Sequence, residues 1–308
     1  MTNLTLKQLR YFEALVRHGH FGRAADACAI SQPALSMQIK ELEESLGTAL
    51  FERGARQVQL TNFGKQFALR TRDILSSVDA LGDLAQASRD RLVGPLRIGV
   101  IPTVAPYLLP TIIGNLTRLH EGLDIHVRET LTPKLIQELA DGRLDTAIVA
   151  LPVSEPSLTE IALFTENFVL VRPGEDEGKP VPDRETLREM KLLLLEEGHC
   201  FRDQALAFCN MQSVLTRELL DGSSLSTLVQ MVGAGIGVTL IPEMAVAMET
   251  RSAYVSLARF KSPQPSRTIG MVWRKTSPLV TQLLQICEVV RGSADMLRER
   301  HSAIVVSP

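Results

Sequence analysis

The stretch FGRAADACAISQPALSMQIKELEESLGTALFERGARQVQLTNFG, residues 21–64, decides the fold of the N-terminal part of the chain. It begins with a short Ala-rich helix, whose small side chains allow another helix to pack closely. Ser31 is a favourable N-cap for a second helix, Pro33 fits its first turn, and Gly47 suits its C-terminal end. The apolar residues that share one face of this second helix are Leu35, Ile39, Leu42 and Leu46. Two short helices joined by a tight turn match the helix-turn-helix plan.

The opposite face of the second helix carries side chains that suit DNA. Gln32 and Ser36 can hydrogen-bond to base edges, and Lys40 can reach a phosphate. Residues 50–61 are expected to form a β-hairpin whose two arginines can contact phosphate or the minor groove. The candidate DNA-binding residues are Gln32, Pro33, Ser36, Lys40, Arg53 and Arg56. On this pattern alone, a plain helical bundle is the alternative.

Charge and length support a division of the chain. The 308 residues carry a net charge of −2, but residues 1–72 alone have ten basic and six acidic side chains. A length of about 150 residues per domain predicts two domains. A basic N-terminal module on an acidic body points to a polyanionic partner for the first part only.

Residues 62–92 form the longest uninterrupted helical pattern. Its apolar residues follow nearly heptad spacing, and Gly94 and Pro95 end it. The apolar seam consists of Phe63, Phe67, Ile74, Val78, Leu81 and Ala85. Little apolar sequence nearby can cover this seam, so a dimerisation helix is favoured over a helix that packs only on its own domain.

From residue 95 onward, strand and helix patterns alternate. This alternation predicts an α/β domain with a mostly parallel sheet and helices on both faces. Strand candidates include Phe168–Val171 and Thr268–Trp273, with the single tryptophan in the core, and a helix is expected at Arg202–Asn210.

The cysteines and the N-terminus indicate a cytoplasmic protein with reduced thiols. Four cysteines are too few for a disulfide-stapled secreted scaffold, and the first residues lack the apolar stretch of a signal peptide. The most apolar run, residues 231–248, is interrupted by glycines, Pro242 and Glu243, so no membrane span is expected. Cys28 and Cys287 are expected to be packing residues.

Cys200 and Cys209 lie in EEGHCFRDQALAFC, whose spacing matches neither a zinc site nor a C-x-x-C redox motif. Two buried structural thiols are one possibility. Against it, Cys200 lies at a strand-to-helix junction where backbone amides favour a thiolate, and His199 and Arg202 can lower its pKa. Nine residues of helix rise about 13.5 Å and turn about 900°, whereas a disulfide needs Cα atoms within roughly 7 Å. The two thiols can therefore join only if the helix unwinds, which would make a two-state switch.

The block at residues 21–64 resembles the winged helix-turn-helix signature of LysR-type transcriptional regulators, and the resemblance extends over the whole chain. It implies a DNA-binding domain at 1–61, a dimerising linker helix at 62–93 and a two-lobed regulatory domain at 94–308, similar to type 2 periplasmic binding proteins. Lobe I would comprise 94–166 and 267–308, and lobe II 167–266. The family implies a homotetramer, a dimer of dimers, that bends double-stranded promoter DNA and acts with RNA polymerase.

Three segments resemble the peroxide-sensing members of that family: IPTVAPYLLP at 101–110, LLLLEEGHCFRDQALAFC at 192–209 and SRTIGMVWR at 266–274. This resemblance implies that hydrogen peroxide oxidises Cys200 and that Cys209 resolves the product as a disulfide, which a cytosolic thiol reductant later opens. The residues that the resemblance assigns to the peroxide pocket are Thr103, Thr132, His199 and Arg267, supported by Asp203.

Two other functions compete with this interpretation. One is a LysR-type regulator that binds a small metabolite between its lobes, with inert cysteines. The other is a thiol peroxidase that uses Cys200, which the helix-turn-helix argues against. No cofactor or metal is expected, and the protein is expected to be a regulator rather than an enzyme.

Overall fold

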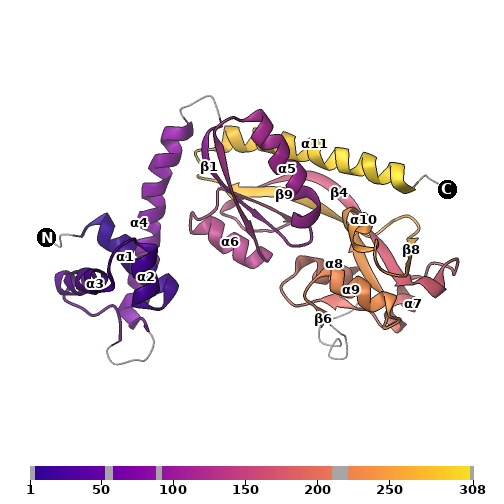
Figure 1. Cartoon of the computed structure of the whole chain (residues 1–308), viewed down its shortest axis with the longest axis horizontal. Coiled ribbons are helices and arrows are strands. Elements are labelled where there is room, and N and C mark those ends of the chain that lie inside the picture. Colours follow the sequence, from indigo (N-terminus) through magenta and orange to yellow (C-terminus); the bar gives the residue numbers. More distant parts are fainter. Residues whose placement is uncertain (1–3, 53–57, 88–91, 210–220, 306–308) are drawn as a thin grey trace. The chain divides into compact units, whose positions relative to one another are not determined.

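The computed structural model describes residues 4–52, 58–87, 92–209 and 221–305 (Figure 1). The chain forms two compact units, Met1–Ala85 and Gln86–Pro308, each with its own hydrophobic core. Within the described residues, no helix has the length and apolar character needed to cross a lipid bilayer.

Three short helices build the core of the first unit: α1 (Leu6–His18), α2 (Phe21–Ala27) and α3 (Gln32–Leu46). The predicted ends of α3 are confirmed, because the Ser31 side chain accepts a hydrogen bond from the Ala34 amide and Gly47 adopts a left-handed conformation. The apolar face of α3 packs against α1 and α2, as predicted.

The chain then leads through a single antiparallel bridge, Phe51 with Leu60, into α4 (Asn62–Ala87). The tip of the expected hairpin, including Arg53 and Arg56, lies outside the described residues. The start of α4 is anchored to the first unit, because the Phe67 ring packs edge-on against Phe12 with 5.1 Å between centroids.

The second unit is built on a seven-stranded sheet with the order β2-β1-β3-β9-β4-β7, and β8 pairs with β4. The strands of this sheet are β1 (Gly94–Val100), β2 (Leu123–Glu129), β3 (Thr146–Leu151), β4 (Leu158–Pro173), β7 (Thr239–Pro242), β8 (Val255–Arg259) and β9 (Ser266–Arg274). Short strands β5 (Leu194–Leu195) and β6 (Asp221–Gly222) form a separate parallel pair.

The prediction of a mostly parallel sheet is wrong. Within this sheet, the parallel pairs are β1 with β2 and β1 with β3. Strands β4 and β9 pair antiparallel with each other, β9 also pairs antiparallel with β3, and β4 pairs antiparallel with β7 and β8. The 16-residue strand β4 pairs with β9 along its first part and with β7 and β8 along its last part. It therefore carries the chain from one half of the unit to the other, and β9 returns in the opposite direction. Alternation of strands and helices does not reveal such a reversal.

Helices surround both halves of this unit (Figure 1). The α-helices described in the first half are α5 (Ala105–Leu119), α6 (Thr132–Ala140) and α11 (Val280–Val305), and those in the second are α7 (Arg184–Glu189), α8 (Cys200–Phe208), α9 (Leu225–Gly233) and α10 (Val246–Glu249). A continuous apolar core extends through both halves and includes the buried Trp273, as predicted.

Candidate functional site

Helix α8 holds Cys200 and Cys209 at its two ends. Cys200 is its first residue and is partly exposed, whereas Cys209 follows the last helical residue and is fully buried. Both thiols are free. At about 1.5 Å per residue, the nine residues of α8 keep the two cysteines more than a disulfide's reach apart.

The buried thiols have weakened acidity. Burial raises the pKa of Cys209 to about 11, although the nearby positive charges of Arg184 and Arg188 oppose this effect. Burial also raises the pKa of Cys287 to about 11. Cys28 packs against the core of the first unit and its pKa is raised, mainly by burial. Cys28 and Cys287 therefore occupy packing positions.

The start of α8 is shaped by a tight turn and two basic residues. Gly198 adopts a φ of +93°, which favours glycine, and a side chain there would meet Leu131. Burial lowers the pKa of His199, although Glu196 opposes the shift, and this favours the neutral imidazole. Arg202 is buried and donates to the Leu195 carbonyl oxygen at 2.7 Å, which ties α8 to the end of β5.

Arg267 and Thr103 meet beside the start of α8. The Arg267 guanidinium donates to the Thr103 hydroxyl at 2.7 Å and to its carbonyl oxygen at 3.0 Å. It also lies over the ring of Phe201, at 5.2 Å from the centroid. Its charge is balanced by Glu166, whose carboxylate accepts from Nε at 2.8 Å. Glu166 was not anticipated, because an isolated acidic residue in a strand pattern gives no signal of burial.

Two polar side-chain atoms, on α6 and on α8, are buried without a partner in the described part of the chain. The Thr132 hydroxyl, at the start of α6, is buried without a hydrogen-bond partner among the described residues, as is Oε1 of Gln204, one helical turn after Cys200. A buried polar atom without a partner is costly, so these atoms suit a small polar ligand. Asp203, which was expected to support the pocket, is exposed in the first turn of α8.

The candidate DNA-binding residues of α3 share an exposed face. Gln32, Pro33, Ser36 and Lys40 are all exposed, opposite the buried apolar residues of the helix. Lys40 forms a 3.6 Å ion pair with Glu44 in which both side chains are largely exposed, so the lysine can exchange this partner at little cost.

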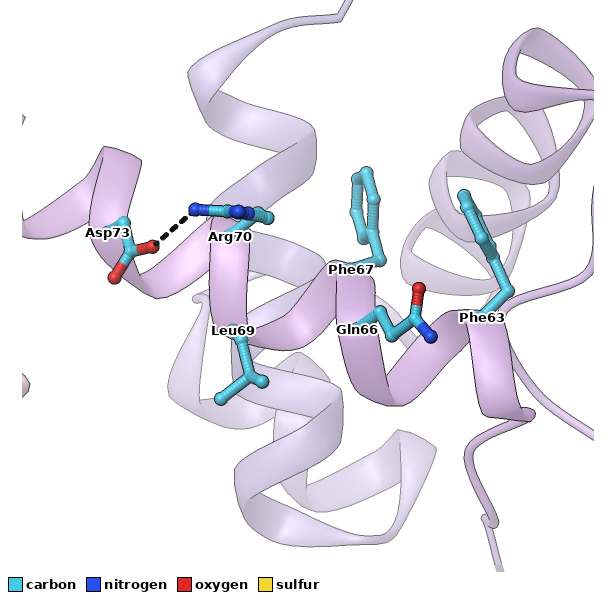
Figure 2. Close-up of a pocket in the computed structure, with 6 residues that line it drawn as sticks. All are labelled: Phe63, Gln66, Phe67, Leu69, Arg70 and Asp73. Atoms are coloured by element: carbon cyan, nitrogen blue, oxygen red, sulfur yellow. Dashed lines mark ion pairs between the residues drawn. The ribbon is translucent and has the colours of Figure 1, made fainter.

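A groove of about 640 Å³ follows α4 (Figure 2). It is lined by Phe63, Gln66, Phe67, Leu69, Arg70 and Asp73. Of the predicted apolar seam, Phe63, Ile74 and Leu81 are exposed, whereas Phe67 also packs against the first unit. These three exposed residues of the seam thus lack a cover from the described residues of their own unit.

Both units match sequence models of known families. Residues 6–65 match the bacterial regulatory helix-turn-helix protein, lysR family, and residues 89–294 match the LysR substrate binding domain. A probable hydrogen peroxide-inducible genes activator from Streptomyces viridosporus is 43% identical over 93% of each chain. The DNA-binding transcriptional dual regulator OxyR of Escherichia coli K12 is 40% identical over 95% of this chain and 96% of its own.

Solved structures match over nearly the full length as well. A full-length OxyR variant from Pseudomonas aeruginosa has a TM-score of 0.74 and 36% identity, and covers 94% of this chain and 95% of its own. A hydrogen peroxide-bound OxyR mutant from Corynebacterium glutamicum has a TM-score of 0.69 and 32% identity, over 99% and 97% of the two chains. The similarity therefore includes both units.

Proposed function

The chain belongs to the LysR family of DNA-binding transcriptional regulators, which are not enzymes, and on this premise we propose that a reversible Cys200–Cys209 disulfide makes it a hydrogen peroxide switch. The similar OxyR proteins support peroxide sensing. The observation that carries the disulfide proposal is the contrast between the ends of α8, with a partly exposed thiol beside polar groups at one end and a buried thiol at the other.

The first step oxidises Cys200. Its proton passes to His199, and the thiolate sulfur attacks one peroxide oxygen. The O–O bond breaks, and the departing hydroxide takes the proton back from His199 and leaves as water, while Cys200 becomes a sulfenic acid. Hydroxyl and guanidinium donors of Thr103, Thr132 and Arg267 can orient the peroxide and stabilise the departing oxygen.

The second step closes the disulfide. The Cys209 sulfur attacks the Cys200 sulfur, the S–O bond breaks, and the hydroxyl leaves as water with the Cys209 proton. In total, one peroxide and two thiols give one disulfide and two waters. Because the intact helix separates the two cysteines, α8 must unwind before this bond can form. A cytosolic dithiol would reverse the reaction by thiol–disulfide exchange.

The first unit would deliver the response to promoter DNA. We assign residues 1–61 to DNA binding, 62–93 to dimerisation through the exposed seam of α4, and 94–308 to regulation, with lobes at 94–166 plus 267–308 and at 167–266. In a dimer of dimers, refolding near α8 would reposition the DNA-binding units and alter contacts with RNA polymerase. Gln32, Ser36 and Lys40 would contact DNA from α3, flanked by Arg53 and Arg56.

Mass spectrometry and footprinting test this proposal together. After treatment with one equivalent of peroxide, digestion should yield a peptide pair linked through Cys200 and Cys209, and the promoter footprint should change. The Cys200→Ser chain should give one footprint with and without peroxide. A different linkage, or a peroxide-dependent footprint in Cys200→Ser, would contradict the switch. A footprint that responds instead to an added metabolite would favour the metabolite-binding alternative.

A further inference from the structure

We propose that Arg184 is a positioning residue for disulfide closure: it holds Phe208, and with it the Cys209 end of α8, in the packing of the reduced protein. Its contact with Phe208 must break before Cys209 can approach Cys200. Arg184 therefore sets how readily the oxidised Cys200 is resolved. This inference rests on the proposed function.

The contact belongs to a stack of three side chains. The Arg184 guanidinium lies over the ring of Phe208, at 4.9 Å from the centroid. On its other side, Phe208 packs edge-on against Phe260, with 5.0 Å between centroids. Phe260 is part of the core, whereas Phe208 is only partly buried and precedes Cys209 directly. Release of the buried thiol therefore requires that Phe208 leave this stack.

The opposite end of α8 has a similar stack, but a more deeply buried one. Phe201 packs edge-on against Phe168 at 4.8 Å and lies beneath Arg267. Arg267 is buried and also bonded to Thr103 and Glu166, whereas Arg184 is exposed on the six-residue helix α7. Arg184 thus holds the Cys209 end through an exposed contact, whereas Arg267 holds the Cys200 end through a buried one.

Charge and contact predict opposite effects of removing Arg184. Arg184 and Arg188 both lie on α7, and both favour the thiolate of Cys209. If Arg184 acted only through its charge, its loss would slow closure, because fewer Cys209 thiolates would be available. If it restrains Phe208, its loss would speed closure. Arg188→Ala removes a similar charge on the same helix and is the matched control.

The experiment measures the two chemical steps separately in the full-length chain. Sulfenic acid formation is followed in a Cys209→Ser background with a sulfenic acid-specific nucleophile after rapid mixing with hydrogen peroxide. Closure is followed in chains with both cysteines, by quenching with a thiol-alkylating reagent and mass spectrometry. Arg184→Ala should leave the first rate unchanged and speed the second about two- to fivefold, the factor expected for an exposed cation–π contact.

Two further variants complete the test. Phe208→Leu keeps an apolar side chain but loses both ring contacts, so it should also speed closure, and Arg188→Ala should not. Closure in Arg184→Ala that is unchanged or slower, or equal acceleration by both arginine variants, would overturn the inference while leaving the proposed function intact. If the unmodified chain forms no Cys200–Cys209 disulfide, both fail.

Discussion

Helices α3 and α8 carry the candidate functional residues of their respective units, yet they are stabilised in different ways. Helix α3 has 15 residues, a Ser31 side chain bonded to its first turn, and Gly47 in a left-handed conformation at its end. Helix α8 has nine residues, and the His199 side chain at its start makes no capping hydrogen bond. Helices this short are marginal in isolation, so α8 depends on packing of side chains such as Phe201 and Phe208.

Under the proposed function, α3 would keep one structure for DNA binding, whereas α8 would change its structure on oxidation. Capping at both ends and the packing of its apolar face against α1 and α2 keep α3 helical. Under the proposed function, its exposed face would present the same side chains in every state of the regulator. In the same proposal, packing contacts keep α8 helical in the reduced protein, and the Cys200–Cys209 disulfide would overcome them. Four experiments test this contrast.

The largest effect is expected from Cys209→Ser. Without a resolving thiol, oxidation should stop at the Cys200 sulfenic acid, so the peroxide-dependent footprint should be lost completely. The measurement is footprinting together with mass spectrometry after peroxide. Cys287→Ser is the matched control, since that thiol is equally buried and its pKa is also raised to about 11. A full peroxide-dependent change of the footprint in Cys209→Ser would show that the response does not require α8 to unwind.

Changes in α3 should alter DNA recognition alone. Gln32→Ala should reduce discrimination at one base pair by about 1–3 kcal/mol, because a bidentate base contact is lost. Lys40→Ala should weaken binding to all sequences and lower the slope of log affinity against log salt by about one. Titrations with matched and mismatched operators measure both, and disulfide closure should be unchanged in both variants. Altered closure would contradict the independence of the two helices.

A glycine in α8 should favour the disulfide form. Ala207 is exposed, so Ala207→Gly weakens the helix by about 1 kcal/mol without a packing defect. The equilibrium with a dithiol redox buffer should shift toward the disulfide by about fivefold. Met37→Gly, at an exposed position of α3, is the control and should leave this equilibrium unchanged. An unshifted equilibrium in Ala207→Gly would mean that the disulfide forms without unwinding.

The smallest expected effect is a difference in the pH dependence of stability between changes at the two N-cap residues, His199 of α8 and Ser31 of α3. Because burial lowers the pKa of His199 in the folded protein, its neutral form contributes stability that is present above the unfolded value of about 6.5 and lost as pH falls below it. Urea midpoints at about pH 7.5 and about pH 5.5 should therefore differ less in His199→Gln than in the unmodified chain.

Ser31→Ala provides the comparison for that experiment. Loss of its capping hydrogen bond should lower stability by about 1 kcal/mol at both pH values, because a hydroxyl does not titrate in this range. An identical pH dependence in the unmodified chain and in His199→Gln would show that the buried imidazole does not stabilise the start of α8.

Local signals made much of the fold and site predictable. Ser31, Pro33 and Gly47 act through bonds to neighbouring residues, so the limits of α3 could be predicted before any tertiary contact was known. The separation of Cys200 and Cys209 follows likewise from helix geometry alone. The sheet directions and Glu166 could not be predicted, since they depend on residues far apart in the chain. Glu166 and Arg267, for example, are bonded across 101 positions.

The order of residues along the chain by itself determined where α3 begins and ends, which face of α3 is exposed, and that an intact α8 holds its two cysteines apart. All of these follow from the fixed rise and turn of a helix and from hydrogen bonds within a few residues. Only the tertiary structure decided which thiol is buried, that burial lowers the pKa of His199, and that Arg184 lies over the ring of Phe208. Burial and charge at a side chain are set by neighbours that distant parts of the chain supply.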